Sequence, residues 1–106
     1  MSEKEALDAL RMMVRERDWE QFHSLENLAK SVAIEAGELL ECFQWADAAP
    51  NDRIIDELAD VLTYCYLLAA KLGVEPSEAV INKLELTRSK YPVEEARGSS
   101  AKYTEL

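Results

Sequence analysis

Hydrophobic residues along this chain recur every three or four positions, the spacing that places them on one face of a helix. In the first such segment, Leu7, Leu10 and Met13 or Val14 form the apolar stripe, and charged residues occupy the other face. No segment shows the strict polar and apolar alternation of a strand. The pattern therefore predicts an all-α fold with four helices, over residues 4–18, 25–45, from a cap at Asn51 or Asp52 to 72, and 76–90.

Capping and turn residues punctuate these segments. We expect Ser24 to cap the second helix, Asn51 or Asp52 to cap the third, and Gly73 to end the third. Pro76 suits the first turn of the fourth helix, where its missing N–H costs nothing. Because the connections are short, the prediction is an antiparallel four-helix bundle in a single domain over residues 1–106, with a polar tail from about residue 92 to 106.

Two pairs of acidic residues interrupt the apolar pattern of the second and third helices. Glu35 and Glu38 are spaced i, i+3, and so are Glu57 and Asp60, so that each pair shares one helix face. If the two helices pack antiparallel, the four carboxylates converge. An acidic pair is often just a solvated face, but Glu35, Glu38 and Asp60 have no Lys or Arg three or four residues away. Oxygen ligands of this kind suit Mg²⁺, and the four acids are the expected metal ligands.

Aromatic residues follow the acids on both helices. Trp45 continues the face of Glu38, and Tyr64 continues the face of Asp60. Acids at one end of a groove and aromatic rings at the other suit a nucleotide that binds a metal through its phosphates and stacks its base. Trp19 and His23 lie in the connector between the first two helices, away from a regular apolar stripe. The alternative for Trp45 and Tyr64 is an ordinary place in the core.

Composition limits the other possibilities. With 21 acidic against 12 basic residues, the net charge of −9 opposes binding to a nucleic-acid polymer. The longest apolar run, residues 61–70, is too short to cross a membrane, and no signal peptide is recognisable, so a cytoplasmic protein is expected. Cys42 and Cys65 are expected to be buried thiols. A hydrophobic share of 48% exceeds what a small core can bury and indicates an oligomer.

Together the motifs resemble those of the MazG-like all-α nucleoside triphosphate pyrophosphatases, through Glu35-x-x-Glu38 and Glu57-x-x-Asp60. The di-iron motif Glu-x-x-His does not occur, which favours Mg²⁺ over redox chemistry. The resemblance is greatest to the dCTP pyrophosphatase branch and extends over nearly the whole chain. It rests on Arg17-Asp-Trp-Glu-Gln-Phe-His23, Gly37-Glu-Leu, Phe43-Gln-Trp45, Lys90-Tyr-Pro-Val93, Arg97-Gly-Ser and Lys102-Tyr-Thr104.

The resemblance implies hydrolysis of a nucleoside triphosphate, dCTP in this branch, to the monophosphate and pyrophosphate. It implies Mg²⁺ on the four acids and a homodimer or homotetramer with sites at protomer boundaries. It also implies a set of substrate-binding residues, which comprises Trp19, His23, Trp45, Tyr64, Lys83, Thr87, Arg88, Lys102 and Tyr103. Thr87 is a departure, since near relatives tend to carry Asn there, and this affects the expected sugar or phosphate selectivity.

For catalysis, Glu38 is the first candidate for the general base and Glu41 the second, while Lys83 and Arg88 are expected to hold the leaving pyrophosphate. Two alternatives stay open at this point. One is a relaxed or dUTP-directed pyrophosphatase of the same superfamily, and the other is a non-enzymatic, acidic helical binding module.

Overall fold

A computed structural model describes residues 1–45 and 47–106. Over these residues the chain is helical and contains no strand, which confirms the all-α class. The chain divides into two compact units, Met1–Val74 and Glu75–Leu106, and each is described by itself. The first three predicted helices belong to the first unit and the fourth belongs to the second.

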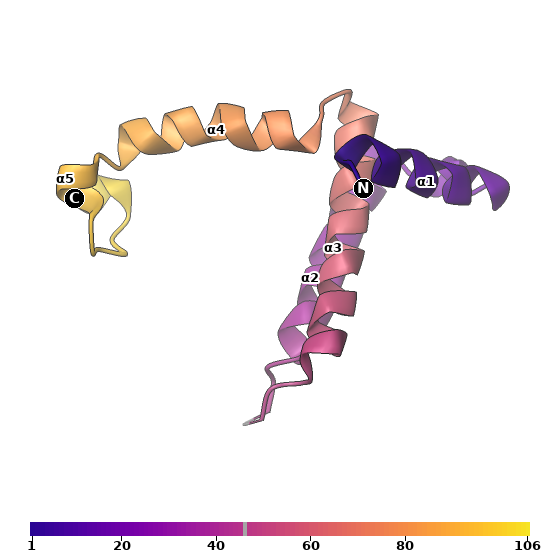
Figure 1. Cartoon of the computed structure of the whole chain (residues 1–106), viewed down its shortest axis with the longest axis horizontal. Helices are drawn as coiled ribbons and strands as arrows, with labels where there is room; N and C mark the ends of the chain where they lie inside the picture. The colour runs from indigo at the N-terminus through magenta and orange to yellow at the C-terminus, as the bar shows by residue number, and fades with distance from the viewer. Residues whose placement is uncertain (46) are drawn as a thin grey trace. The chain divides into compact units, whose positions relative to one another are not determined.

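In the first unit, α2 (Leu25–Glu41) and α3 (Asn51–Leu72) lie side by side as an antiparallel hairpin (Figure 1). The helix α1 (Glu3–Glu16) contacts α3, and a short 3₁₀ turn, η1 (Glu20–Phe22), links α1 to α2. The core is small: Val14, Leu28 and Leu67, one from each helix, are buried against one another. Four partly buried side chains surround them, namely Leu10, Met13, Tyr64 and Leu68.

Two of the expected helix boundaries are confirmed by the local geometry. The Ser24 hydroxyl oxygen accepts a hydrogen bond from the Asn27 N–H at 3.1 Å, as an N-cap residue should. Gly73 ends α3 with φ 75°, a left-handed conformation that favours glycine. The predicted cap of α3 is wrong, however, because Pro50 is the N-cap and its carbonyl accepts from the N–H groups of Arg53 and Ile54. Asn51 is therefore already the first helical residue, followed by Asp52.

The first two helices end earlier than the periodicity predicts. Helix α1 stops at Glu16, and Asp18 with φ 54° turns the chain so that the Trp19 N–H donates to the Val14 carbonyl. Helix α2 stops at Glu41, because the following N–H groups bond three residues back and tighten into turns. Trp45 thus lies beyond α2 and does not continue the face of Glu35 and Glu38, which corrects that expectation.

The second unit contains α4 (Pro76–Lys90), the short α5 (Val93–Ala96) and a 3₁₀ turn, η2 (Tyr103–Glu105). The Tyr91 hydroxyl oxygen accepts a hydrogen bond from the Tyr103 N–H at 3.2 Å. The two tyrosine rings meet edge to face at 6.0 Å, and the Lys90 ammonium lies 4.7 Å from the Tyr103 ring centre. The polar tail therefore returns to the C-terminal end of α4.

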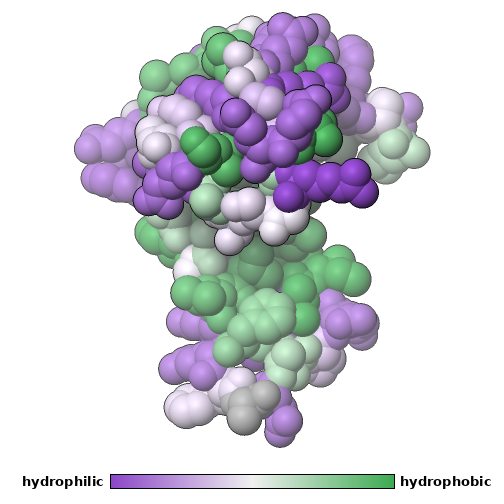
Figure 2. Space-filling model, turned by 90° about the vertical axis from the view of Figure 1, so that its left-hand side faces the viewer, coloured by the Kyte–Doolittle hydropathy of each residue, from purple (hydrophilic) through white to green (hydrophobic). Residues whose placement is uncertain are grey.

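Many large hydrophobic side chains stay on the surface of the first unit. Figure 2 shows them gathered over the hairpin, where Ile34 and Leu40 of α2 and Ile55, Leu58 and Leu62 of α3 are exposed.

Cys42 is buried and Cys65 is only half-buried, and both are free thiols. Among the described helices, none combines the length and the hydrophobicity needed to cross a bilayer.

Candidate metal centre

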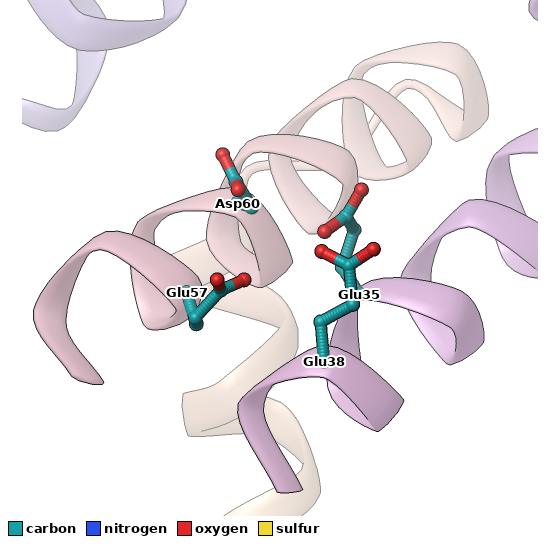
Figure 3. A group of neighbouring side chains, drawn as sticks. All are labelled: Glu35, Glu38, Glu57 and Asp60. Carbon is teal, nitrogen blue, oxygen red and sulfur yellow. The ribbon is translucent and has the colours of Figure 1, made fainter. Parts of the chain in front are cut away.

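Four carboxylates meet at the seam between α2 and α3. Glu35 and Glu38 extend from α2, and Glu57 and Asp60 extend from α3 (Figure 3). Each side chain offers one oxygen, and these four oxygens all lie within 4.8 Å of one another. The helical spacing places the two members of each pair on one face, and the antiparallel hairpin sets the two faces against each other. The structure thus brings together the four acids that the sequence singles out.

Two oxygens of this cluster are enclosed without a partner. Glu35 Oε2 and Glu57 Oε2 are shielded from solvent, and neither has a hydrogen-bond partner. A buried polar atom normally has a partner, because otherwise it loses its hydration without compensation. The two orphaned oxygens come from different helices and belong to the same cluster. A cation between the helices would satisfy both at once.

The electrostatics of the four carboxylates also favour a bound cation. Burial raises the pKa of Glu35 above its usual value, and the neighbouring Glu38, Asp60 and Glu57 raise it further. Burial also raises the pKa of Glu57, with Glu38 and Asp60 adding to the rise and Arg53 opposing it. No Lys or Arg forms an ion pair with the cluster in the described part of the chain. The repulsion between these like charges is therefore left for a bound cation to relieve.

Glu41 does not belong to this group of four. It is the last residue of α2 and is exposed, and its backbone carbonyl accepts a hydrogen bond from the Gln44 N–H at 3.2 Å. Glu38 is exposed as well, but it differs from Glu41 because it interacts with both Glu35 and Glu57. Of the two candidates for the general base, Glu38 is the one that combines access to solvent with a place in the cluster.

The predicted base-binding residues of the first unit are distributed over several places. Trp19 is 43% exposed, with the Arg17 guanidinium 5.8 Å from its ring centre. Trp45 is 76% exposed in the turn after α2, whereas Tyr64 is partly buried against the small core. His23 follows η1 and lines a separate cleft, described below.

The predicted phosphate-binding residues lie in the second unit. Lys83 and Thr87 share one face of α4, where the Thr87 hydroxyl donates to the Lys83 backbone carbonyl at 3.2 Å. Arg88 is exposed in the last turn of the same helix. Lys102 caps η2, and the Tyr103 ring packs on Tyr91.

The cleft that contains His23 involves basic residues that the sequence patterns did not single out. Arg11 and Arg15 come from α1 and Lys71 from the last turn of α3. The i, i+4 spacing of the two arginines was a signal that could have drawn attention to them. What could not be read from the sequence is that Lys71 lies beside them, because this depends on how α1 contacts α3.

Comparison with known proteins places the chain in a family. The family model described as the MazG-like family matches residues 30–106. The chain is 46% identical to dCTP pyrophosphatase 1 of Rattus norvegicus and 45% identical to that of Homo sapiens, in each case over 86% of this chain. It spans only 59% of the length of each of these two relatives.

A solved structure extends this likeness to the fold. The crystal structure of a pyrophosphatase from Archaeoglobus fulgidus superposes with a TM-score of 0.79 and is 38% identical in sequence. The match covers 84% of this chain and 91% of the archaeal one. With the family model matching most of the chain, and with the four acids on facing helices, this chain belongs to the MazG-like family.

Proposed function

We propose that this chain is a Mg²⁺-dependent nucleoside triphosphate pyrophosphohydrolase whose preferred substrate is dCTP. The observation that carries the proposal is the acid cluster between α2 and α3, in which one carboxylate oxygen of Glu35 and one of Glu57 are buried without a hydrogen-bond partner. Membership of the MazG-like family supports the reaction class. The names of the mammalian relatives, dCTP pyrophosphatase 1, support the substrate.

In this proposal Glu35, Glu38, Glu57 and Asp60 hold the metal. When bound, Mg²⁺ neutralises phosphate charge and lowers the pKa of a coordinated water. Glu38 takes the proton of the attacking water as the anhydride bond between the α and β phosphates breaks, and the products are the nucleoside monophosphate and pyrophosphate. The solvent-accessible position of Glu38 within the cluster favours this role over Glu41.

Lys83, Arg88 and Lys102 stay predicted phosphate ligands on the strength of the resemblance. Thr87 stays a predicted substrate contact, but its hydroxyl proton is already donated to the Lys83 carbonyl. It therefore has acceptor capacity to offer, where an Asn amide would provide a donor as well. This difference bears on how strictly the sugar or the phosphates are selected.

A turnover panel tests the proposed function. All canonical deoxynucleoside and ribonucleoside triphosphates are assayed side by side with Mg²⁺, and the products are identified. We expect dCTP to be the best substrate, with dCMP and pyrophosphate as products and no turnover in EDTA. Preference for dUTP or a flat profile would favour the relaxed alternative, and Mg²⁺-dependent binding with no turnover of any nucleotide would favour the binding module.

Removing the tryptophan rings should weaken substrate binding. If Trp19 and Trp45 stack on the base, Trp19→Ala and Trp45→Ala should each raise the KM for dCTP roughly tenfold, the worth of one lost stack. Both rings are exposed enough to be truncated without opening the core. The measurement is KM and kcat across five deoxynucleotides, with Trp45→Phe as the control that keeps a ring. An unchanged KM in both alanine variants would mean that the base binds elsewhere.

A further inference from the structure

Arg53 lies on the same face of α3 as the acids of the metal centre. It precedes Glu57 by four residues and Asp60 by seven, which places the three side chains within about 60° of one another around the helix axis. Along that axis Arg53 is about 6 Å from Glu57. Tyr64 continues the same face beyond Asp60. On α3 the acids are thus flanked by a cation on one side and by an aromatic ring on the other.

Arg53 is the cation that the hairpin places beside its acid cluster. The sequence has no other Lys or Arg between Lys30 and Lys71. Lys30 lies on another side of α2, about 140° around the helix from Glu35. Lys71 is eleven residues along α3 from Asp60, roughly 16 Å at the rise of an α-helix. Neither of these lysines is placed to meet an anion that binds at the metal centre.

The guanidinium of Arg53 is available for such an anion. The side chain is exposed, and within the described residues it forms no ion pair and no hydrogen bond with another side chain. Burial and the neighbouring acids raise the pKa of Glu57, and the charge of Arg53 opposes that rise, so this charge is within electrostatic reach of the cluster. A cation bound to Glu57 would take over the role of counter-charge and leave the guanidinium donors of Arg53 for another ligand.

We propose that Arg53 binds the phosphate end of the substrate beside the metal centre. A guanidinium matches two phosphate oxygens at once, through paired charge-assisted hydrogen bonds. Because the acids lie between Arg53 and Tyr64 on α3, a substrate held at the acids extends its phosphates towards the cation and its base away from it. The group that Arg53 holds is therefore the pyrophosphate that leaves. This assignment rests on the proposed function for the identity of the substrate.

The charge of Arg53 has opposite effects on the two ligands of this site. It repels a cation that binds to the four carboxylates, and it attracts a phosphate anion that binds beside that cation. Loss of the charge should therefore tighten the binding of Mg²⁺ and weaken the binding of pyrophosphate. Damage to the fold would weaken both, so the two opposite signs separate a direct electrostatic role from a structural one.

The test is calorimetric titration of the full chain with two ligands, Mg²⁺ in the absence of any nucleotide and inorganic pyrophosphate at saturating Mg²⁺. We expect Arg53→Gln to bind Mg²⁺ more tightly, by up to about fivefold, which is the range for an interaction between solvent-exposed charges. It should bind pyrophosphate about tenfold more weakly or worse, the worth of one charge-assisted hydrogen bond. Arg53→Lys keeps the charge but loses the paired geometry, so its Mg²⁺ affinity should equal that of the wild type and its pyrophosphate affinity should be intermediate.

The matched control is Lys30→Gln, which removes the same charge from α2, where Lys30 pairs with Glu26. Both of its affinities should equal those of the wild type. Unchanged pyrophosphate affinity in Arg53→Gln, or weaker binding of both ligands, would overturn the assignment of Arg53. A chain that turns over dCTP with unchanged pyrophosphate affinity in Arg53→Gln loses only this assignment. A chain that binds pyrophosphate through Arg53 but turns over no triphosphate loses only the proposed function.

Discussion

Glu38→Gln is expected to lower the rate of pyrophosphate release from dCTP at least a hundredfold. The substitution keeps the size of the side chain but removes the charge that helps hold the metal and the group that accepts the proton. Loss of a general base alone typically costs about 10²–10⁴ in rate. The measurement is initial rate of pyrophosphate release at saturating Mg²⁺ and dCTP. Activity within a few-fold of the wild type would remove Glu38 from both roles.

The same variant should not be less stable than the wild type when metal is absent. Glu38 raises the pKa values of both Glu35 and Glu57, so its charge disfavours their ionised forms in the folded chain. Removing that charge relieves repulsion, and we expect the Tm of Glu38→Gln in EDTA to equal or exceed that of the wild type.

Glu41→Gln is the control for the activity measurement, since Glu41 lies outside the group of four acids. If Glu41→Gln loses more activity than Glu38→Gln, the base is Glu41.

Leu62→Glu is expected to dissociate the oligomer that the exposed apolar surface of the hairpin indicates. Ile55, Leu58 and Leu62 are spaced three and four residues apart on α3, and Leu62 is 47% exposed. Burying one leucine side chain contributes about 1.5–3 kcal/mol. Leu62 is about half exposed, so about half of this value is available in each protomer, and the two protomers of a dimer together lose about 1.5–3 kcal/mol. Association should therefore weaken by about tenfold to a hundredfold, because 1.4 kcal/mol corresponds to a factor of ten.

Light scattering at micromolar concentration measures the mass of the assembly in solution. The wild type should have the mass of a dimer or tetramer of 12.0 kDa chains, and Leu62→Glu should approach the mass of one chain. Lys30→Glu, a larger change of charge on an exposed part of α2, is the control and should leave the mass unchanged. A folded, active wild type with the mass of a single chain would rule out the proposed homodimer and homotetramer alike.

Local sequence signals were sufficient for the helices and for several of their boundaries. Ser24 and Gly73 mark helix ends because a hydroxyl that accepts an N–H and a residue without Cβ act over one turn of chain. The periodicity failed at the end of α2, since apolar residues continue to Trp45 while the backbone has already left the helix at Glu41. Turn hydrogen bonds and the bond from the Ala49 N–H to the Cys42 carbonyl set that boundary, and hydrophobic spacing does not report on them.

The sequence by itself determined which acids share a helix face, because spacings of three and four residues have a fixed meaning on an α-helix. It therefore identified Glu35, Glu38, Glu57 and Asp60 as two pairs. Only the tertiary structure decided that the pairs face each other within 4.8 Å and that one oxygen of Glu35 and one of Glu57 are enclosed without a partner. Only it brought Lys71 beside Arg11 and Arg15. Burial and proximity between helices depend on how whole helices pack, and no local spacing encodes that.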